Sequence, residues 1–438
     1  MRNNSVAISG AALAVLSALA AQPVKSFSIT ADDWTFSFDG NVNVAYIYSS
    51  CQTANSTQPV TGGLACTGSQ SGSSVSNVSN GLLPAALDFG VSTTQDGYDI
   101  AAHFGLYPGI ATNDTGTPNL GPLGINTGAA SVGAGNVALG TTGLDVRQVY
   151  LTFGNKDIGT FTLGRNFGLF GFDAIINDIT IRGVGVAGSS STAAPANTTL
   201  GSIGLGYIYV DTLAQINYTT PDFAGFNFTI GIFDPLNSLS DPGTPETKKQ
   251  PGFHGKLTYT TKFSDDVKFY ASATFINQKQ NFLSLANQGT ALTPVATSFQ
   301  YTGQGEDVFA KLNVGAFEFD ASYYYATGLG TTAFFLYGDD GFGHTRKSDG
   351  YLVQGSYTVG PLKLGVNYGV SKLDFANAAD AAANPNLVRS NGKVTGGAYY
   401  SLTKSLTLVG EVSSVTAEAD NDVRNKSYNV NAGAFLAF

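Results

Sequence analysis

The sequence predicts an all-β protein in which sixteen antiparallel strands close into a barrel that crosses a membrane. Apolar and polar residues alternate through most of the chain, as expected for strands with one apolar and one polar face. Charged residues make up only 12% of the sequence, about half of their usual share in soluble proteins. No stretch after residue 21 reaches about 18 uninterrupted apolar residues, so spanning helices are excluded. A closed barrel is the other way to pair every backbone group inside a bilayer.

Residues 1–20 have the three parts of a secretory signal peptide. Arg2 supplies a positive charge, residues 6–20 form an apolar run, and Ala18-Leu19-Ala20 fits a cleavage site of small residues. The alternative is a short buried helix, which the terminal position disfavours. Removing Arg2 changes the net charge from −9 to about −10, and no basic cluster occurs elsewhere. We therefore expect no binding to nucleic acid.

The two cysteines, Cys51 and Cys66, stand in a stretch rich in Ser, Thr, Gly and Asn. A metal site would need more ligands, and no histidine is near them in the sequence. Because an exported protein meets an oxidising environment, we expect a disulfide that closes a surface loop, with free thiols as the alternative. Such a bond stabilises the fold by on the order of 3 kcal/mol and carries no chemistry of its own.

Alternation can be followed strand by strand. In the first predicted strand, Trp34, Phe36 and Phe38 share one face, while Asp39 and Asn41 share the other. We predict sixteen strands, at residues 34–48, 84–93, 97–107, 145–154, 158–166, 203–220, 225–234, 253–263, 267–278, 306–314, 316–327, 349–359, 362–371, 392–402, 405–417 and 427–438.

The connections between these strands fall into two classes that take turns along the chain. Seven are short and eight are long, as an even-stranded barrel requires when both termini lie at the short-turn end. Sixteen strands also leave a lumen wide enough for water. The polar face is therefore predicted to line a channel.

Charges of both signs project inward by this parity. They are Asp39, Asp99, His103, Lys256, Lys262, Lys268, Lys311, Glu318, Asp320, Lys363, Lys393 and Glu411. Because the lumen is mixed, the net charge of the chain does not decide ion selectivity.

Three segments resemble the general porins of Gram-negative bacteria. The pair RQVYLTFG and DIGTFTLGRNFG, at residues 147–154 and 157–168, is similar to the fourth and fifth strands of that family. Residues 217–226, NYTTPDFAGF, resemble a turn of the family, and the terminal strand ending in Phe438 resembles the signal that outer-membrane assembly machinery reads. The segments occur in the right order, and the resemblance with the strand plan spans nearly all of the mature chain.

The resemblance implies an outer-membrane trimer whose third long loop, here 167–202, folds into the barrel and narrows it. Opposed charges then act across the constriction, with Asp178 on the loop and Arg147 on the wall as first candidates and Asp173, Arg182 and Arg165 behind them. Simple alternation turns Arg147 outward with Val149 and Leu151, whereas the resemblance places it in the lumen. Arg182 belongs either to the loop or to the wall. Arg165 shares parity with Leu163, so a loop or subunit contact is its alternative.

The signal peptide and the resemblance together divide the chain, and the resemblance implies its partners. Residues 1–20 are the cleaved signal, 21–33 a periplasmic segment and 34–438 the barrel. Expected partners are outer-membrane lipid and lipopolysaccharide, the assembly machinery, and small hydrophilic solutes and ions that diffuse passively through the bacterial outer membrane. Two alternatives stay open: a substrate-specific channel, and a surface adhesin or structural barrel with an occluded lumen.

Other motifs favour no chemistry. Residues 183–188 match G-x-G-x-x-G, but no amphipathic helix follows, so a nucleotide site is not expected. His103, His254 and His344 have no nucleophile pattern near them, so no enzyme is predicted. Acidic pairs at 339–340 and at 420 and 422 could bind Ca²⁺, although solvated loop charge is the preferred interpretation. No cofactor and no metal are implied.

Overall fold

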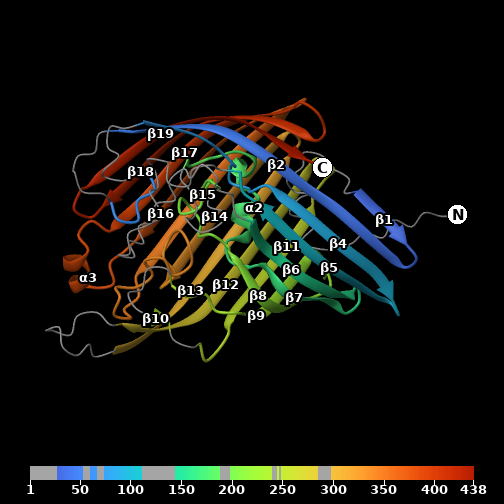
Figure 1. Cartoon of the computed structure of the whole chain (residues 1–438), viewed down its shortest axis with the longest axis horizontal. Helices are drawn as coiled ribbons and strands as arrows, with labels where there is room; N and C mark the ends of the chain where they lie inside the picture. The colour runs from blue at the N-terminus through green and yellow to red at the C-terminus, as the bar shows by residue number, and fades with distance from the viewer. Residues whose placement is uncertain are drawn as a thin grey trace.

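The computed structural model describes residues 27–52, 60–66, 74–110, 144–187, 198–238, 244–245, 248–284 and 297–438. The predicted signal peptide lies outside these residues. Sixteen antiparallel strands of the described chain close one barrel: β2 Trp34–Cys51, β4 Ala86–Gln95, β5 Tyr98–Pro108, β6 Leu144–Asn155, β7 Gly159–Phe167, β8 Thr212–Thr219, β9 Phe226–Phe233, β11 Gly252–Lys262, β12 Val267–Ser284, β13 Thr297–Val314, β14 Phe317–Thr327, β15 Lys347–Val359, β16 Leu362–Leu373, β17 Val388–Ser401, β18 Leu406–Ala419 and β19 Arg424–Ala437. The predicted fold class is confirmed (Figure 1).

Within the described residues, three short strands and three short helices are added to this barrel. β1 (Phe27–Ala31) and β3 (Ser74–Ser79) pair with the two ends of β2, and β10 (Thr244–Pro245) pairs with β12. The helices are α2 (Phe172–Ile176), the 3-10 helix η2 (Ile179–Arg182) and α3 (Ala378–Ala383). None of the helices in the described ranges is long and apolar enough to cross a membrane.

The barrel closes between its last and first strands. β19 pairs with β2 from Ser427 opposite Cys51 to Ala437 opposite Asn41. The backbones of Gly40 and Phe438 then exchange two hydrogen bonds, of 3.0 and 3.1 Å. Just beyond Phe438, β1 takes over the same edge of β2, so part of the segment predicted to precede the barrel extends its sheet. β1 lies at the same end as the C-terminus, and α3 at the opposite end (Figure 1).

The two faces of the sheet differ as the alternation predicts. On β2, Val42 and Val44 are 45% and 41% exposed on the outside, whereas Asn41 and Asn43 are 2% and 3% exposed on the inside. Aromatic side chains gather on the outer face near the short turns, for example the stacked rings of Phe153 and Phe161. Outward apolar side chains with aromatic rings near the rim are typical of a lipid-facing surface.

One predicted strand starts nine residues too early. The pattern of residues 203–220 predicts a continuous strand, but β8 begins only at Thr212. Residues 203–211 instead fold inside the barrel, because Gly204 and Gly206 have φ angles of +75° and +129°, which extended strands do not use. The alternating apolar residues of this stretch serve a different core.

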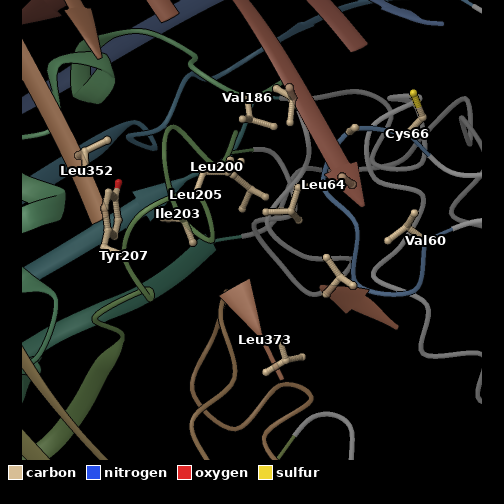
Figure 2. Close-up of a cluster of buried hydrophobic side chains, with 14 of the residues drawn as sticks. Val60, Leu64, Cys66, Val186, Leu200, Ile203, Leu205, Tyr207, Leu352 and Leu373 are labelled. Atoms are coloured by element: carbon tan, nitrogen blue, oxygen red, sulfur yellow. The ribbon is translucent and has the colours of Figure 1, made fainter. Parts of the chain in front are cut away.

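That core fills part of the long-loop end of the barrel (Figure 2). Val60 and Leu64 come from the first long loop, Leu200 and Leu205 from the third, and Leu352 from the wall. The Cys51–Cys66 disulfide closes the first of these loops. The interior at this end is therefore packed by side chains of several loops as well as lined by the wall.

A buried ion pair joins two further loops at the same end. The guanidinium of Arg346 donates two hydrogen bonds to the carboxylate of Asp380 in α3, at 2.5 and 2.7 Å, and both side chains are at most 4% exposed. This bidentate pairing of a buried guanidinium with a carboxylate fixes the orientation of both side chains as well as their position. The described parts of these loops thus form a packed cap at this end of the barrel.

The outer face can be tested with one charge. Val412, in the middle of β18, is 58% exposed on the outside. We expect Val412→Arg to lower the free energy of unfolding in lipid by about 2–4 kcal/mol, because an unpaired cation would face hydrocarbon. Urea titration of the barrel in vesicles measures this change. The matched control is Thr258→Arg on the inner face of β11, which should be near neutral; equal losses in both variants would contradict the assignment of the faces.

Candidate functional site

The candidate site is the inner wall of the barrel together with the chain between β7 and β8. This inner segment is described over residues 168–187 and 198–211. It contacts inward-facing side chains of β11, β12, β13, β16, β17 and β18. At its start, Asp173 of α2 accepts hydrogen bonds from Lys256 Nζ at 2.7 Å and from Ser272 Oγ at 2.5 Å. The backbone N–H of Gly171 donates to Asp307 at 2.7 Å. These bonds hold α2 against β11, β12 and β13.

Asp178 holds the next part of the inner segment. It is 1% exposed and accepts hydrogen bonds from Ser202 N (3.0 Å), Tyr207 Oη (2.8 Å) and Asn367 Nδ2 (3.2 Å). Its carboxylate also accepts from the backbone N–H and the hydroxyl of Thr180, so that Asp178 caps the N-terminus of η2. The residue predicted to present its charge to the pore is therefore enclosed by donors and joins two stretches of the inner segment to β16.

Two further wall charges secure the far part of the segment. Glu411 accepts from the N–H groups of Val184 and Gly185 at 2.9 and 2.8 Å. Lys393 donates to the carbonyl of Gly201 at 2.8 Å and to Ser202 Oγ at 2.6 Å. A Cβ at Gly183 would lie 1.9 Å from Glu411 Oε1, so a larger residue there would displace this carboxylate from the backbone N–H groups that it binds. The glycines of the G-x-G-x-x-G match that the structure describes, Gly183 and Gly185, lie against this carboxylate.

Arg147 is turned inward by a β-bulge. The register of β5 and β6 shifts so that Gly105 lies opposite Gln148 and Leu106 opposite Val146, which leaves Arg147 as the extra residue. Its Cζ lies 5.6 Å from the ring centroid of inward-facing Tyr107. Simple alternation was therefore the wrong guide to this side chain, although its Nε bonds Asp145 at 2.5 Å rather than a loop acid.

Arg165 and Arg182 lie apart from this group. Arg165 stands opposite Ala214 and outward-facing Val149, and donates to Thr212 Oγ1 at 3.1 Å. Arg182 ends η2 in the inner segment, so it belongs to the loop, and its Cζ lies 5.9 Å from the ring centroid of Phe435. Burial lowers the pKa of Arg182 to about 10, which leaves it charged at neutral pH.

Towards the short-turn end the inner wall carries a compensated charge group. Glu318 accepts from Lys311 at 2.8 Å and from Lys363 at 2.9 Å, and these three side chains remain between 21% and 37% exposed. Asp320 beside them accepts from Gln354 Nε2 at 2.7 Å. Lys262 pairs with Asp265 in a short turn at 2.6 Å.

Acidic groups dominate the wall formed by β2, β4 and β5. Asp39 stands directly opposite Asp88, and His103 Nε2 lies 3.2 Å from Asp88 Oδ1. Asp99, nearer the rim, accepts from Thr94 at 2.7 Å. Sequence reasoning missed Asp88, although outward-facing Leu87 and Phe89 would have placed it inside by parity.

The described residues contain no group of three or more His, Cys, Asp or Glu side chains arranged to hold a metal ion. Asp339 accepts from the N–H groups of Gly341 and Gly343, both at 3.0 Å. Asp340 bonds the imidazole of His344 at 2.8 Å; partial burial raises the pKa of this carboxyl, but its hydrogen bonds outweigh that effect and lower the pKa overall. His254 is buried and its ring stacks on Phe233 with centroids 3.9 Å apart.

A closed barrel with a lipid-facing exterior and a charged interior defines a membrane-spanning channel scaffold. The fold is similar to that of the outer membrane channel DcaP of Acinetobacter baumannii, with a TM-score of 0.63 and 16% identity over 95% of this chain and 100% of that one. It is also similar to OprB of Pseudomonas putida, with a TM-score of 0.54 and 11% identity over 92% and 94% of the two chains. OmpT of Vibrio cholerae matches with a TM-score of 0.50 and 12% identity over 94% and 100%. These identities are low enough that the likeness is one of fold alone.

Residues 6–420 match the family model described as Gram-negative porin. The chain therefore belongs to the Gram-negative porin family, and its location is the bacterial outer membrane. No curated protein matches the sequence.

The role of Asp178 as an anchor can be tested by hydrogen exchange. Asp178→Ala leaves the N–H of Ser202 and the hydroxyl of Tyr207 without their charged acceptor, which costs about 2–4 kcal/mol. We expect amide exchange within residues 198–207 to accelerate at least about thirtyfold, because local opening becomes easier. Mass spectrometry of the folded barrel measures the rate. Thr180→Val, which removes one donor and keeps the carboxylate, should change it much less; an unchanged rate in Asp178→Ala would show that the contacts of this carboxylate do not hold the segment.

Proposed function

We propose that the protein is a porin through which small hydrophilic solutes and ions diffuse passively. The observation that carries the proposal is the partly exposed charge on the inner wall at the short-turn end, where Lys311, Glu318 and Lys363 keep part of their surface accessible inside the barrel. Charges facing the interior of a wide barrel are stable when water fills it. Hydrated solutes would therefore meet a hydrated path.

The inner segment would set the narrowest part of this path. Its polar contacts are with β11–β13, β16 and β18, and its Val184 also packs with Ala45 of β2. The side of the interior from β2 to β6 presents Asp39, His103 and Arg147. We propose that solutes pass between the inner segment and this side, with size as the first criterion for passage.

The remaining partners follow from membership of the family. We propose that the protein is a homotrimer surrounded by outer-membrane lipid and lipopolysaccharide. Phe438, hydrogen-bonded to Gly40 at the seam, would serve as the terminal signal for the assembly machinery. No catalytic step is part of this function.

Planar-bilayer recording of the purified full-length protein tests the proposal. We expect stable conductance steps that grow in proportion to KCl concentration, because ions would move through water. In proteoliposomes, swelling rates should fall smoothly as the size of neutral sugars increases. Vesicles prepared without protein are the control for leakage.

The same measurements separate the alternatives. Block of the current by one solute at low concentration would contradict simple diffusion and favour a substrate-specific channel. Protein that inserts as a folded barrel but gives no conductance would overturn the channel and leave a structural barrel with an occluded lumen. The tightly packed cap around Leu64 and Leu205 is the observation that keeps this second candidate in view.

A further inference from the structure

The strongest unexplained feature of the interior is a pair of carboxylates that face each other across two neighbouring strands. Asp39 on β2 and Asp88 on β4 are direct partners in the strand register. Like charges in this position destabilise a sheet, because their side chains lie closest together there. Placing both on the inner wall is therefore costly unless something compensates them.

Hydrogen bonds compensate only part of this charge. Asp88 is 3% exposed, and its Oδ1 accepts from Tyr107 Oη and lies near His103 Nε2, both at 3.2 Å. Asp88 Oδ2 and Asp39 Oδ1 are buried, and no donor in the described part of the chain reaches either oxygen. Even with His103 protonated, the group of Asp39, Asp88 and His103 keeps a net negative charge.

Asp320 Oδ1 is also buried without a donor, but this carboxylate lies beside Lys311 and Lys363, and four other inward carboxylates have direct partners. Asp173 and Glu318 are neutralised by lysines at 2.7–2.9 Å. Asp178 and Glu411 are enclosed by hydrogen-bond donors from the inner segment and the wall. Nearby cations and hydrogen-bond donors compensate these charges, so they contribute little to the electric field inside the lumen.

We propose that the Asp39–Asp88 pair is a selectivity determinant that makes the pore prefer cations, both small inorganic cations and solutes that carry an ammonium group. The proposal rests on the channel function proposed above. Asp39 is the member of the pair with surface open to the lumen, and Asp88 stands behind it and reinforces its charge. A cation passing along β2 and β4 is attracted by the incompletely compensated negative charge of the pair, whereas an anion is repelled by it.

Reversal potentials in a KCl gradient test the pair directly. We expect the wild-type channel to favour K⁺ over Cl⁻, and Asp39→Asn to reduce the permeability ratio by a factor of about three to five. Asp39→Asn/Asp88→Asn should bring the ratio close to one, and Asp39→Lys should favour Cl⁻. Swelling of proteoliposomes in lysine and in glutamate gives a second readout, with lysine entering faster only when the pair is intact.

Asp157→Asn is the matched control, since Asp157 lies in a short turn, 74% exposed and beside Lys156. Its ratio should stay at the wild-type value. If Asp88→Asn prevents folding, Asp39→Asn alone decides, because its substituted side chain keeps the shape of the original. Wild-type channels that open but do not favour K⁺, or whose ratio is unchanged in Asp39→Asn, would overturn the inference and leave the porin function standing. Absence of conductance in the wild type would instead overturn the porin function itself.

Discussion

The structure depends on one constraint: a backbone that crosses hydrocarbon must pair all of its N–H and C=O groups within the protein. A sheet meets this constraint only by closing, and here it closes where β19 meets β2 and Phe438 meets Gly40. Closure in turn fixes which face of each strand meets lipid. The alternation seen in the sequence is a consequence of this geometry, because successive side chains of each strand point alternately to the lipid and to the interior of the barrel.

A closed barrel of this width cannot be filled by its own inner side chains. The chain fills part of the interior with loops, and the contacts that hold these loops change with depth in the barrel. Near the long loops, apolar side chains such as Leu64 and Leu205 pack as in a soluble core. Deeper in the barrel, carboxylates and lysines of the wall bond the backbone and side chains of the inner segment, as Glu411 does at Val184. Apolar packing excludes water from the long-loop end, whereas polar attachment holds the inner segment against the charged wall.

The sequence was a good guide to the strands and a poor one to the interior. Strand positions follow from a period of two, which neighbouring residues reveal directly. The errors came where the period does not control direction: a bulge turns Arg147 inward, and glycines at 204 and 206 convert an apparent strand into a buried loop. Asp178 lies in the loop between β7 and β8, and two of its five donors are local, from Thr180. The other three come from Ser202, Tyr207 and Asn367, which no local pattern could predict. Asp88 was predictable by parity and was overlooked.

The charges that build the inner segment and the charges that could act on solutes are necessarily different residues. A carboxylate that anchors a loop must be surrounded by donors, since a buried charge without partners is too costly to keep. Once surrounded, it exerts only a weak field on anything that passes. Asp173, Asp178 and Glu411 have taken the first role. Influence over a solute is left to groups whose partners are incomplete, and on the wall of β2 and β4 these are Asp39 and Asp88. In this barrel, sequence position within the inner loop is therefore a weaker indicator of pore chemistry than the number of donors around each inward-facing charge.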